Sequence, residues 1–211
     1  MNKKQILLKA KLYVIIDADL LGHQNLDRIT SQAIEGGADL IQFRDKSSND
    51  REFLKIAESL KKITDEVNIP FIINDKVDIA LYLNTAGVHL GQDDLPIWVA
   101  REILGEEKII GISTSDLKQA KEAQKEGADY IGFGPIFYTQ TKKIEEAIGL
   151  NSIQKLKKEI FIPFFAIGGI NLDNLNEVIK AGAGRIAVVS AVVKADDVKL
   201  AVWRLKERLE I

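Results

Sequence analysis

The sequence has no cysteine among its 211 residues. Disulfides, thiolate nucleophiles and zinc–thiolate sites are therefore excluded. Long apolar runs are also missing, and none approaches the roughly 20 residues that a membrane helix needs. The basic start of the chain carries only the short apolar stretch Ile6–Leu8, which is too short for a signal peptide. We therefore expect a soluble, cytoplasmic protein with no membrane partner.

An excess of either charge is lacking as well. The formal net charge is −2 and the sequence pI is about 5.8. Because nucleic-acid binding needs a basic surface, we expect no nucleic-acid partner, and any phosphate group must be held by a local cluster of cations. A hydrophobic content of 46% and a charged content of 28% are ordinary for a globular protein.

Short apolar runs alternate with amphipathic stretches along the whole chain. Eight such runs are nearly continuous in apolar residues, which is typical of parallel strands covered on both faces; they span Leu12–Asp17, Leu40–Asp45, Phe71–Asp75, Gly87–Gly91, Ile109–Thr114, Tyr130–Gly134, Phe164–Gly169 and Arg185–Ser190. Helical patterns lie between them, among them Asp50–Glu66, Asp116–Glu126, Asn171–Ala181 and Asp196–Leu209. This alternation predicts a single α/β domain over residues 1–211, a TIM (β/α)₈ barrel, with a doubly wound open sheet as the alternative.

A weak internal repeat supports the barrel. The segments that each close a helical pattern and open a strand are Gly37-Ala38-Asp39, Thr85-Ala86-Gly87, Gly127-Ala128-Asp129 and Gly182-Ala183-Gly184. Glycine at such points suits a left-handed helix C-cap, so we interpret the repeat as structural and not as a site. The sequence leaves open whether residues 1–11 do more than plug the bottom of the barrel.

Polar side chains alternate at the end of the second run. Gln42, Arg44 and Lys46 share one face, because successive side chains of a strand point to opposite sides, and Phe43 points to the helix layer. Burying an amide and two cations is costly without an anion. The set therefore predicts an anion site at the strand's C-terminal end, where barrel enzymes carry their active sites; the alternative is a solvated strand end.

Two carboxylates follow neighbouring strands. Asp75 ends the third run, and Asp94 comes shortly after the fourth. Mg²⁺ prefers oxygen ligands of this kind and often shares them with substrate phosphates. Either aspartate alone would suit a helix N-cap. The two together, beside the cations of the second run, predict a metal-assisted diphosphate site.

The loops after the last three runs predict a second anion site. The long segment after Gly134 carries hydroxyls and cations that can donate to phosphate oxygens, although a plain surface loop is the alternative. Gly168-Gly169 and Val189-Ser190 end the seventh and eighth runs, where barrels often bind phosphate through backbone N–H groups.

Ser113 and His89 are weaker candidates. The Ser113 hydroxyl ends the fifth run and can contact a ligand, whereas Ser115 more readily caps the next helix. We expect His89, inside the fourth run, to be a hydrogen-bonded core or mouth residue and not a catalyst. The sequence shows no evident nucleophile–His–carboxylate arrangement.

These motifs together resemble the thiamine-phosphate synthase family of TIM-barrel transferases. The resemblance covers Tyr13 to about Ala191 and rests on an ordered set of short motifs: Gln42-Phe43-Arg44-Asp45-Lys46, Asn74-Asp75, Gly87-Val88-His89-Leu90-Gly91-Gln92 with Asp94, Gly134-Pro135-Ile136-Phe137 with Thr139, Thr141 and Lys142, Ala166-Ile167-Gly168-Gly169-Ile170, and Val189-Ser190. The chain departs from the family at Ser115, where many members carry histidine. It also lacks the proline that is common before Gly149-Leu150.

The resemblance implies a reaction and a set of site residues. The family joins 4-amino-5-hydroxymethyl-2-methylpyrimidine diphosphate to a thiazole phosphate and releases pyrophosphate, so the implied partners are these two small molecules. Asp75 and Asp94 would bind Mg²⁺, and the implied catalytic residues are Arg44, Lys46, Ser113 and Lys142. Implied substrate-binding residues are Gln42, Phe43, Arg44, Asp45, Lys46, Asn74, Ser113, Thr139, Gln140, Thr141, Lys142, Gly169, Val189 and Ser190. We further hypothesise that Lys142 closes over the diphosphate from its loop.

Three other functions fit the same fold. The related thiazole tautomerase shares the barrel and the thiazole-phosphate site but needs no diphosphate site. A non-catalytic binding barrel would bind ligand without turnover. A phosphate-handling isomerase would need a general base in the barrel mouth, and no carboxylate beyond Asp75 and Asp94 stands out. The cations and the aspartate pair favour the synthase; the oligomeric state stays open, with a homodimer as one option.

Overall fold

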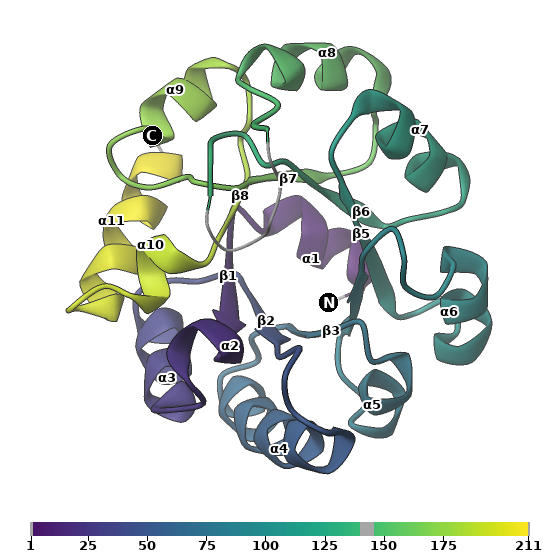
Figure 1. The fold of residues 1–211 in the computed structure, drawn as a ribbon, viewed down its shortest axis with the longest axis vertical. Helices are drawn as coiled ribbons and strands as arrows, with labels where there is room; N and C mark the ends of the chain where they lie inside the picture. The colour runs from purple at the N-terminus through teal and green to yellow at the C-terminus, as the bar shows by residue number, and fades with distance from the viewer. Residues whose placement is uncertain (1, 140–145, 211) are drawn as a thin grey trace.

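The computed structural model describes residues 2–139 and 146–210 and contains a closed barrel of eight parallel strands in chain order (Figure 1). The strands are β1 (Leu12–Asp17), β2 (Leu40–Arg44), β3 (Phe71–Asn74), β4 (Gly87–Leu90), β5 (Ile109–Thr114), β6 (Tyr130–Phe133), β7 (Phe164–Ile167) and β8 (Ile186–Val188). β8 pairs with β1 in parallel and closes the barrel. The TIM barrel predicted from the sequence is therefore confirmed, and the open-sheet alternative is excluded.

Helices surround the barrel and cover the outer faces of its strands, except for the first helix, which lies across one end of the barrel (Figure 1). In the described part of the chain they are α1 (Lys3–Lys9), α2 (Ala18–Leu21), α3 (Leu26–Glu35), α4 (Asp50–Glu66), α5 (Val77–Tyr82), α6 (Ile97–Leu104), α7 (Leu117–Lys125), α8 (Asn151–Glu159), α9 (Leu175–Lys180), α10 (Ser190–Val193) and α11 (Val198–Glu210). Within the same residues, none of these helices is long and apolar enough to cross a membrane.

Helix α4 begins and ends where its pattern predicts, whereas α9 begins four residues after Asn171, the predicted start. The two asparagines before it explain the difference. Asn174 Oδ1 accepts a hydrogen bond from the Asn171 N–H at 2.9 Å, and Asn171 Oδ1 accepts from the Asn174 N–H at 3.3 Å. Asparagine side chains that bond nearby backbone groups favour a turn over a helix.

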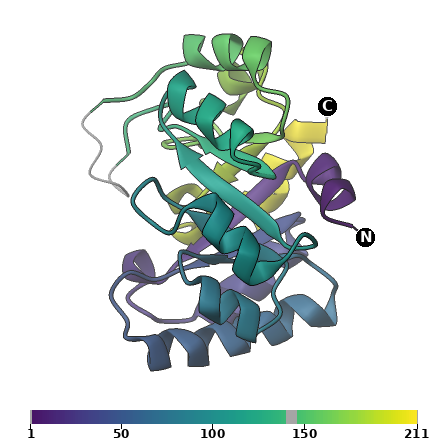
Figure 2. The same cartoon turned by 90° about the vertical axis from the view of Figure 1, so that its right-hand side faces the viewer.

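Side chains alternate between two cores because neighbouring strand residues point to opposite sides. The outward residues pack against the helices in the larger core. The inward residues form a smaller core inside the barrel, with Tyr13, Ile15, Leu40, Ile72, Ile109, Tyr130, Phe165 and Ala187. Leu7 and Ala10 join that inner core from α1 and the residue after it, so the N-terminal segment plugs one end of the barrel (Figure 2).

The repeated Gly-Ala-Asp segments are structural, as predicted. Gly37 and Gly127 follow helices in the left-handed region, with φ of 101° and 90°. Two residues later, the carboxylates of Asp39 and Asp129 accept hydrogen bonds from the backbone N–H groups at the starts of β1 and β5. The repeat thus ends a helix and ties the start of a strand at the end of the barrel away from the predicted site.

Candidate active site

A cavity of about 410 Å³ lies at the C-terminal ends of the strands. Each of the eight strands, or the loop that directly follows it, supplies part of its wall. The volume suits a small-molecule site. The cavity lies at the barrel end where enzymes of this fold have their active sites, and α1 closes the opposite end.

Most of the predicted site residues line this cavity. They come from seven strand ends and are Gln42, Arg44, Lys46, Asn74, Asp94, Ser113, Thr139, Gly169, Val189 and Ser190. Asp75 lies beside them, because its carboxylate pairs with the Lys46 ammonium group. Three further predicted residues, Gln140, Thr141 and Lys142, lie outside the described residues.

The carboxyls of Asp75 and Asp94 lie close enough to shift each other's pKa, just after β3 and β4. Burial and the hydrogen bond to Asp94 raise the pKa of Asp75 above its usual value, although Lys46 opposes the shift. Burial also acts to raise the pKa of Asp94, but hydrogen bonds from Asp75 and from the Gly91 N–H outweigh it and lower that pKa. The two pKa values are thus pushed apart, so Asp75 takes up a proton at a higher pH than Asp94 does.

Neither aspartate caps a helix. The helix that follows Asp75 begins after Lys76, and the helix that follows Asp94 begins after Pro96; neither has a side-chain cap. Asp94 instead turns back on its own loop and accepts a hydrogen bond from the Gly91 N–H at 2.6 Å. The N-cap interpretation is thus wrong for both aspartates. Their carboxyl groups remain available to the cations Arg44 and Lys46.

The two cations at the end of β2, Arg44 and Lys46, already have carboxylate partners within the protein. Arg44 Nη1 donates to Asp17 Oδ2 at 2.7 Å and, less closely, to Asp19 Oδ2 at 3.3 Å. Asp17 is buried at the end of β1 and lines the same cavity. Asp17 was not among the residues predicted from the sequence, although the alternation of β1 places it on the inward face with Tyr13 and Ile15.

Phe43 and Asp45, the other two members of the β2 motif, do not line the cavity. Phe43 is fully buried and stacks on Phe53 of α4 with ring centroids 4.6 Å apart. Asp45 is also buried, and its carboxylate accepts hydrogen bonds from the backbone N–H groups of Ser47 and Ser48. Both side chains point away from the face that carries Arg44, so they stabilise the motif from the side opposite to the cavity.

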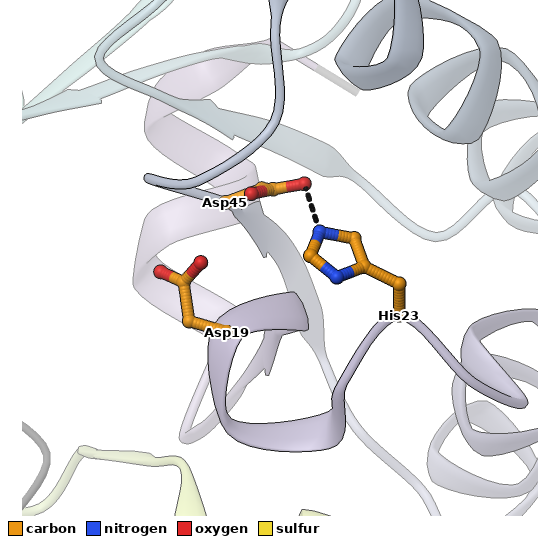
Figure 3. A group of neighbouring side chains, drawn as sticks. All are labelled: Asp19, His23 and Asp45. Atoms are coloured by element: carbon orange, nitrogen blue, oxygen red, sulfur yellow. Dashed lines mark hydrogen bonds and ion pairs between the residues drawn. The ribbon is translucent and has the colours of Figure 1, made fainter.

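Asp19, His23 and Asp45 form a cluster between the loops after β1 and β2 (Figure 3). His23 Nε2 is 2.9 Å from Asp45 Oδ2, and Asp19 accepts a hydrogen bond from the Lys46 N–H. Burial acts to raise the pKa of Asp45, but hydrogen bonds from Ser48, Ser47 and His23 outweigh it and hold that pKa at about 2. Because His23 bonds Asp45 and Asp19 bonds the Lys46 N–H, these contacts tie the two loops together beside the cavity.

Ser115 does not cap α7, so that expectation is corrected. Asp116 caps the helix by accepting a hydrogen bond from the Gln119 N–H at 2.8 Å. Ser115 instead donates its N–H and its hydroxyl to Gln119 Oε1, at 2.8 and 3.1 Å. Both Ser115 and Gln119 line the cavity.

The Gly168-Gly169 pair lets the loop after β6 lie directly against the end of β7. Both glycines have positive φ, 99° and 65°. A Cβ added to Gly168 would be 2.4 Å from Pro135 Cβ, and one added to Gly169 would be 2.6 Å from the Tyr138 carbonyl oxygen. Glycine is required at both positions because the loop after β6 approaches them closely. A ligand in the cavity can approach the same backbone.

A chain of hydrogen bonds crosses the barrel interior below the cavity. Gln42 Nε2 donates to the Tyr13 hydroxyl at 2.6 Å, and the hydroxyls of Tyr13 and Tyr130 are 2.9 Å apart. The Tyr130 hydroxyl is 2.9 Å from His89 Nδ1, and His89 Nε2 is 2.9 Å from Ser113 Oγ. His89 is therefore a hydrogen-bonded residue at the barrel mouth, as expected. The two tyrosines were not singled out from the sequence, although both lie at inward positions of their strands.

Comparison with known proteins points to one family. A family model described as thiamine monophosphate synthase matches residues 12–192. Thiamine-phosphate synthase from Clostridium novyi is 47% identical over 190 residues, which cover 90% of this chain and 93% of that protein. The enzyme of the same name from Halalkalibacterium halodurans is 48% identical over 190 residues, with 90% of each chain covered.

A solved structure gives the same result. The thiamine phosphate pyrophosphorylase from Pyrococcus furiosus superposes with a TM-score of 0.88 at 42% sequence identity. The match covers 99% of this chain and 98% of that one.

Proposed function

This chain belongs to the thiamine monophosphate synthase family, and from that membership we propose that it makes thiamine phosphate. It joins 4-amino-5-hydroxymethyl-2-methylpyrimidine diphosphate to a thiazole phosphate and releases pyrophosphate. The observation that carries the proposal is the pair of interacting carboxyls Asp75 and Asp94 at the ends of neighbouring strands, with Lys46 paired to Asp75 and Arg44 in the same cavity. Two acids and two cations at one side of a cavity suit a diphosphate with a divalent cation.

The diphosphate is assigned to the side of the cavity formed by β2, β3 and β4. Arg44 is oriented by its bond to Asp17, which leaves its other guanidinium nitrogens to donate to phosphate oxygens. Lys46 is about half exposed, with 49% of its side-chain surface accessible, so its ammonium group can move from Asp75 to an anion. Asn74, at the end of β3, adds an amide that can donate to the same group.

The same residues fit Mg²⁺. The structure supports this because the Lys46 ammonium group already brings positive charge to Asp75, whose pKa is raised by burial and by the nearby Asp94. Asp75 and Asp94 would hold the ion through carboxylate oxygens, the ligand type that Mg²⁺ prefers. When bound, Mg²⁺ would neutralise charge that develops on the leaving pyrophosphate.

The reaction needs electrostatics and positioning more than it needs a covalent nucleophile. The bond between the pyrimidine methylene carbon and the diphosphate oxygen breaks, and pyrophosphate leaves with the electron pair. Arg44 and Lys46 stabilise the negative charge that develops on it. The electron-rich aminopyrimidine supports the positive charge on the methylene, and the thiazole nitrogen lone pair then forms the new C–N bond. The barrel holds the two substrates close together, which itself lowers the barrier.

The thiazole phosphate is assigned to the opposite side of the cavity. Gly169, Val189 and Ser190 line it at the ends of β7 and β8, the usual phosphate position in this fold. Thr139 lines the cavity from the loop after β6. Thr141, which the family motif adds, and Lys142, which we assign to the diphosphate, lie outside the described residues.

The assay that tests this function mixes the two substrates with Mg²⁺ and follows thiamine phosphate by chromatography. We expect product only when both substrates are present, and a Lys142→Ala variant should turn over much more slowly. A tautomerase has no use for the Asp75–Asp94 pair. It would interconvert isomers of the thiazole phosphate without forming a C–N bond, and that outcome would overturn the proposal.

A further inference from the structure

The hydrogen-bond chain under the cavity has one end whose direction is fixed. The nitrogen of an amide can only donate, so Gln42 Nε2 donates to the Tyr13 hydroxyl oxygen. The other members, two hydroxyls and an imidazole, can each donate or accept. All but Ser113 are buried, with at most 8% of their surface exposed, so water cannot readily complete a bond that the chain leaves unmade.

Only one order of donors satisfies every hydroxyl in the buried part of the chain. With its oxygen accepting from Gln42, Tyr13 donates to Tyr130, and Tyr130 donates to His89 Nδ1. In the reverse order, the Tyr13 hydroxyl hydrogen would have no acceptor among the residues that the structure describes. An unmade buried hydrogen bond costs about 1–3 kcal/mol, so the first order is favoured.

The interior of the barrel is shaped around this chain. A Cβ added to Gly111 would lie 2.0 Å from Tyr130 Cζ and 2.5 Å from the Tyr130 hydroxyl oxygen, so only glycine leaves room for that ring. Gly132 leaves similar room for His89, whose Cε1 would be 3.3 Å from an added Cβ. Burial raises the pKa of Tyr13 and that of Tyr130, so both hydroxyls keep the hydrogens that the chain needs.

We propose that these five residues form an oriented hydrogen-bond chain that holds His89 as the neutral tautomer protonated on Nε2, with Tyr130 as a positioning residue for the reaction. His89 Nε2–H then donates to Ser113 Oγ, which makes the Ser113 hydroxyl a donor toward its next partner. At the other end, Gln42 uses its nitrogen on Tyr13 and keeps its oxygen as the acceptor for the cavity. The role in catalysis rests on the proposed function, whereas the tautomer and the direction of the chain do not.

The tautomer of His89 can be measured directly, because the protein sequence has two histidines, His23 and His89. Long-range proton–nitrogen correlation NMR of ¹⁵N-labelled protein distinguishes a protonated ring nitrogen from an unprotonated one. A His23→Gln variant assigns the two rings. We expect His89 in the unaltered protein to be protonated on Nε2 alone. Protonation on Nδ1 would overturn the proposal without any variant and without an activity assay.

The direction of the chain is tested by replacing its fixed donor. In Gln42→Glu the end of the chain becomes a carboxylate, which only accepts, so each hydroxyl should turn around and His89 should switch to the Nδ1-protonated tautomer. Adding Tyr130→Phe removes the link, and the double variant should then keep the Nε2-protonated form. If Gln42→Glu leaves the His89 tautomer unchanged, the four bonds do not act as one oriented chain.

The positioning role has a separate readout. Tyr130→Phe keeps the ring in the space beside Gly111 and removes only the hydroxyl, so we expect kcat to fall about tenfold. Tyr82→Phe makes the same change on the surface, where 71% of Tyr82 is exposed, and should leave kcat unchanged. An unchanged kcat in folded Tyr130→Phe would remove the positioning role. No turnover in the unaltered protein would instead contradict the proposed function, and the NMR result would stand.

Discussion

The carboxyls of Asp75 and Asp94 interact with each other and shift each other's pKa, although the two residues follow different strands of the barrel. Burial together with Asp94 raises the pKa of Asp75, so this carboxyl holds a proton more readily than an ordinary aspartate does. A divalent cation can take the place of that proton and of the Lys46 ammonium group. The same two carboxyls thus set the charge on this side of the cavity and form the binding site that we propose for the metal.

Replacing Asp75 should lower the activity of the protein without lowering its thermal stability. Asp75→Asn offers Asp94 an amide donor in place of a second acid, so metal-free protein should unfold at the same or a slightly higher temperature at neutral pH. Turnover should fall at least about 100-fold, because a metal ligand is lost. Asp78→Asn, an exposed change on α5, is the matched control and should alter neither. A clear loss of Tm in Asp75→Asn would show that the pair is mainly structural.

Proton and metal should compete for the same carboxyls. Because burial and Asp94 raise the pKa of Asp75, protonation begins at a higher pH than for an ordinary aspartate, and a protonated carboxyl is a poor ligand. The Mg²⁺ concentration for half-maximal activity should therefore rise as pH is lowered from about 8 to about 5. Mg²⁺ titrations of the initial rate at several pH values measure it. A half-maximal concentration that stays constant over this range would contradict the assignment of Asp75 as a ligand.

Asp17 should matter more to the reaction than Asp19, although both contact Arg44. Asp17 is buried and 2.7 Å from the guanidinium, whereas Asp19 is 3.3 Å away and partly exposed. Asp17→Asn should lower kcat/KM for the pyrimidine diphosphate about tenfold, because Arg44 loses the charge that orients it. Asp19→Asn should change it by a factor of about three or less. Equal effects in the two variants would contradict this ranking.

Gly169 should tolerate no side chain. Gly169→Ala places a Cβ 2.6 Å from the Tyr138 carbonyl oxygen at a φ of 65°, so it forces the loop after β6 away from β7. We expect a loss of about 2–4 kcal/mol in unfolding free energy and a higher KM for the thiazole phosphate. Gly22→Ala has nearly the same φ, 62°, with nothing within 4 Å of the added Cβ, and isolates the backbone strain. Equal losses of unfolding free energy in Gly169→Ala and Gly22→Ala would show that the loop after β6 moves aside at little cost.

The barrel could be predicted because its pattern is local. Each strand is a short apolar run, and each run ends near a polar residue, so alternation alone located the strands. Strand parity also separated Gln42, Arg44 and Lys46, which line the cavity, from Phe43, which packs against α4. The family motif Gln42–Lys46 cannot make that distinction, because it treats all five residues as one unit.

The partners of the site residues could not be predicted, because they depend on which strand ends meet. Arg44 pairs with Asp17 across the β1–β2 register, and nothing in either run indicates the pair. Tyr13 and Tyr130 are separated by 117 residues in the chain and meet only because the barrel closes. The space that Gly111 leaves for Tyr130 is likewise a property of the β5–β6 register.

Release of pyrophosphate tests the central claim most directly. The pyrimidine diphosphate is incubated with the protein, with and without the thiazole phosphate, first in Mg²⁺ and then in EDTA. We predict release that requires both substrates and the metal, with thiamine phosphate formed in equal amount. Absence of release under every condition, in protein shown to be folded, would contradict the assignment of this cavity as a thiamine-phosphate synthase site.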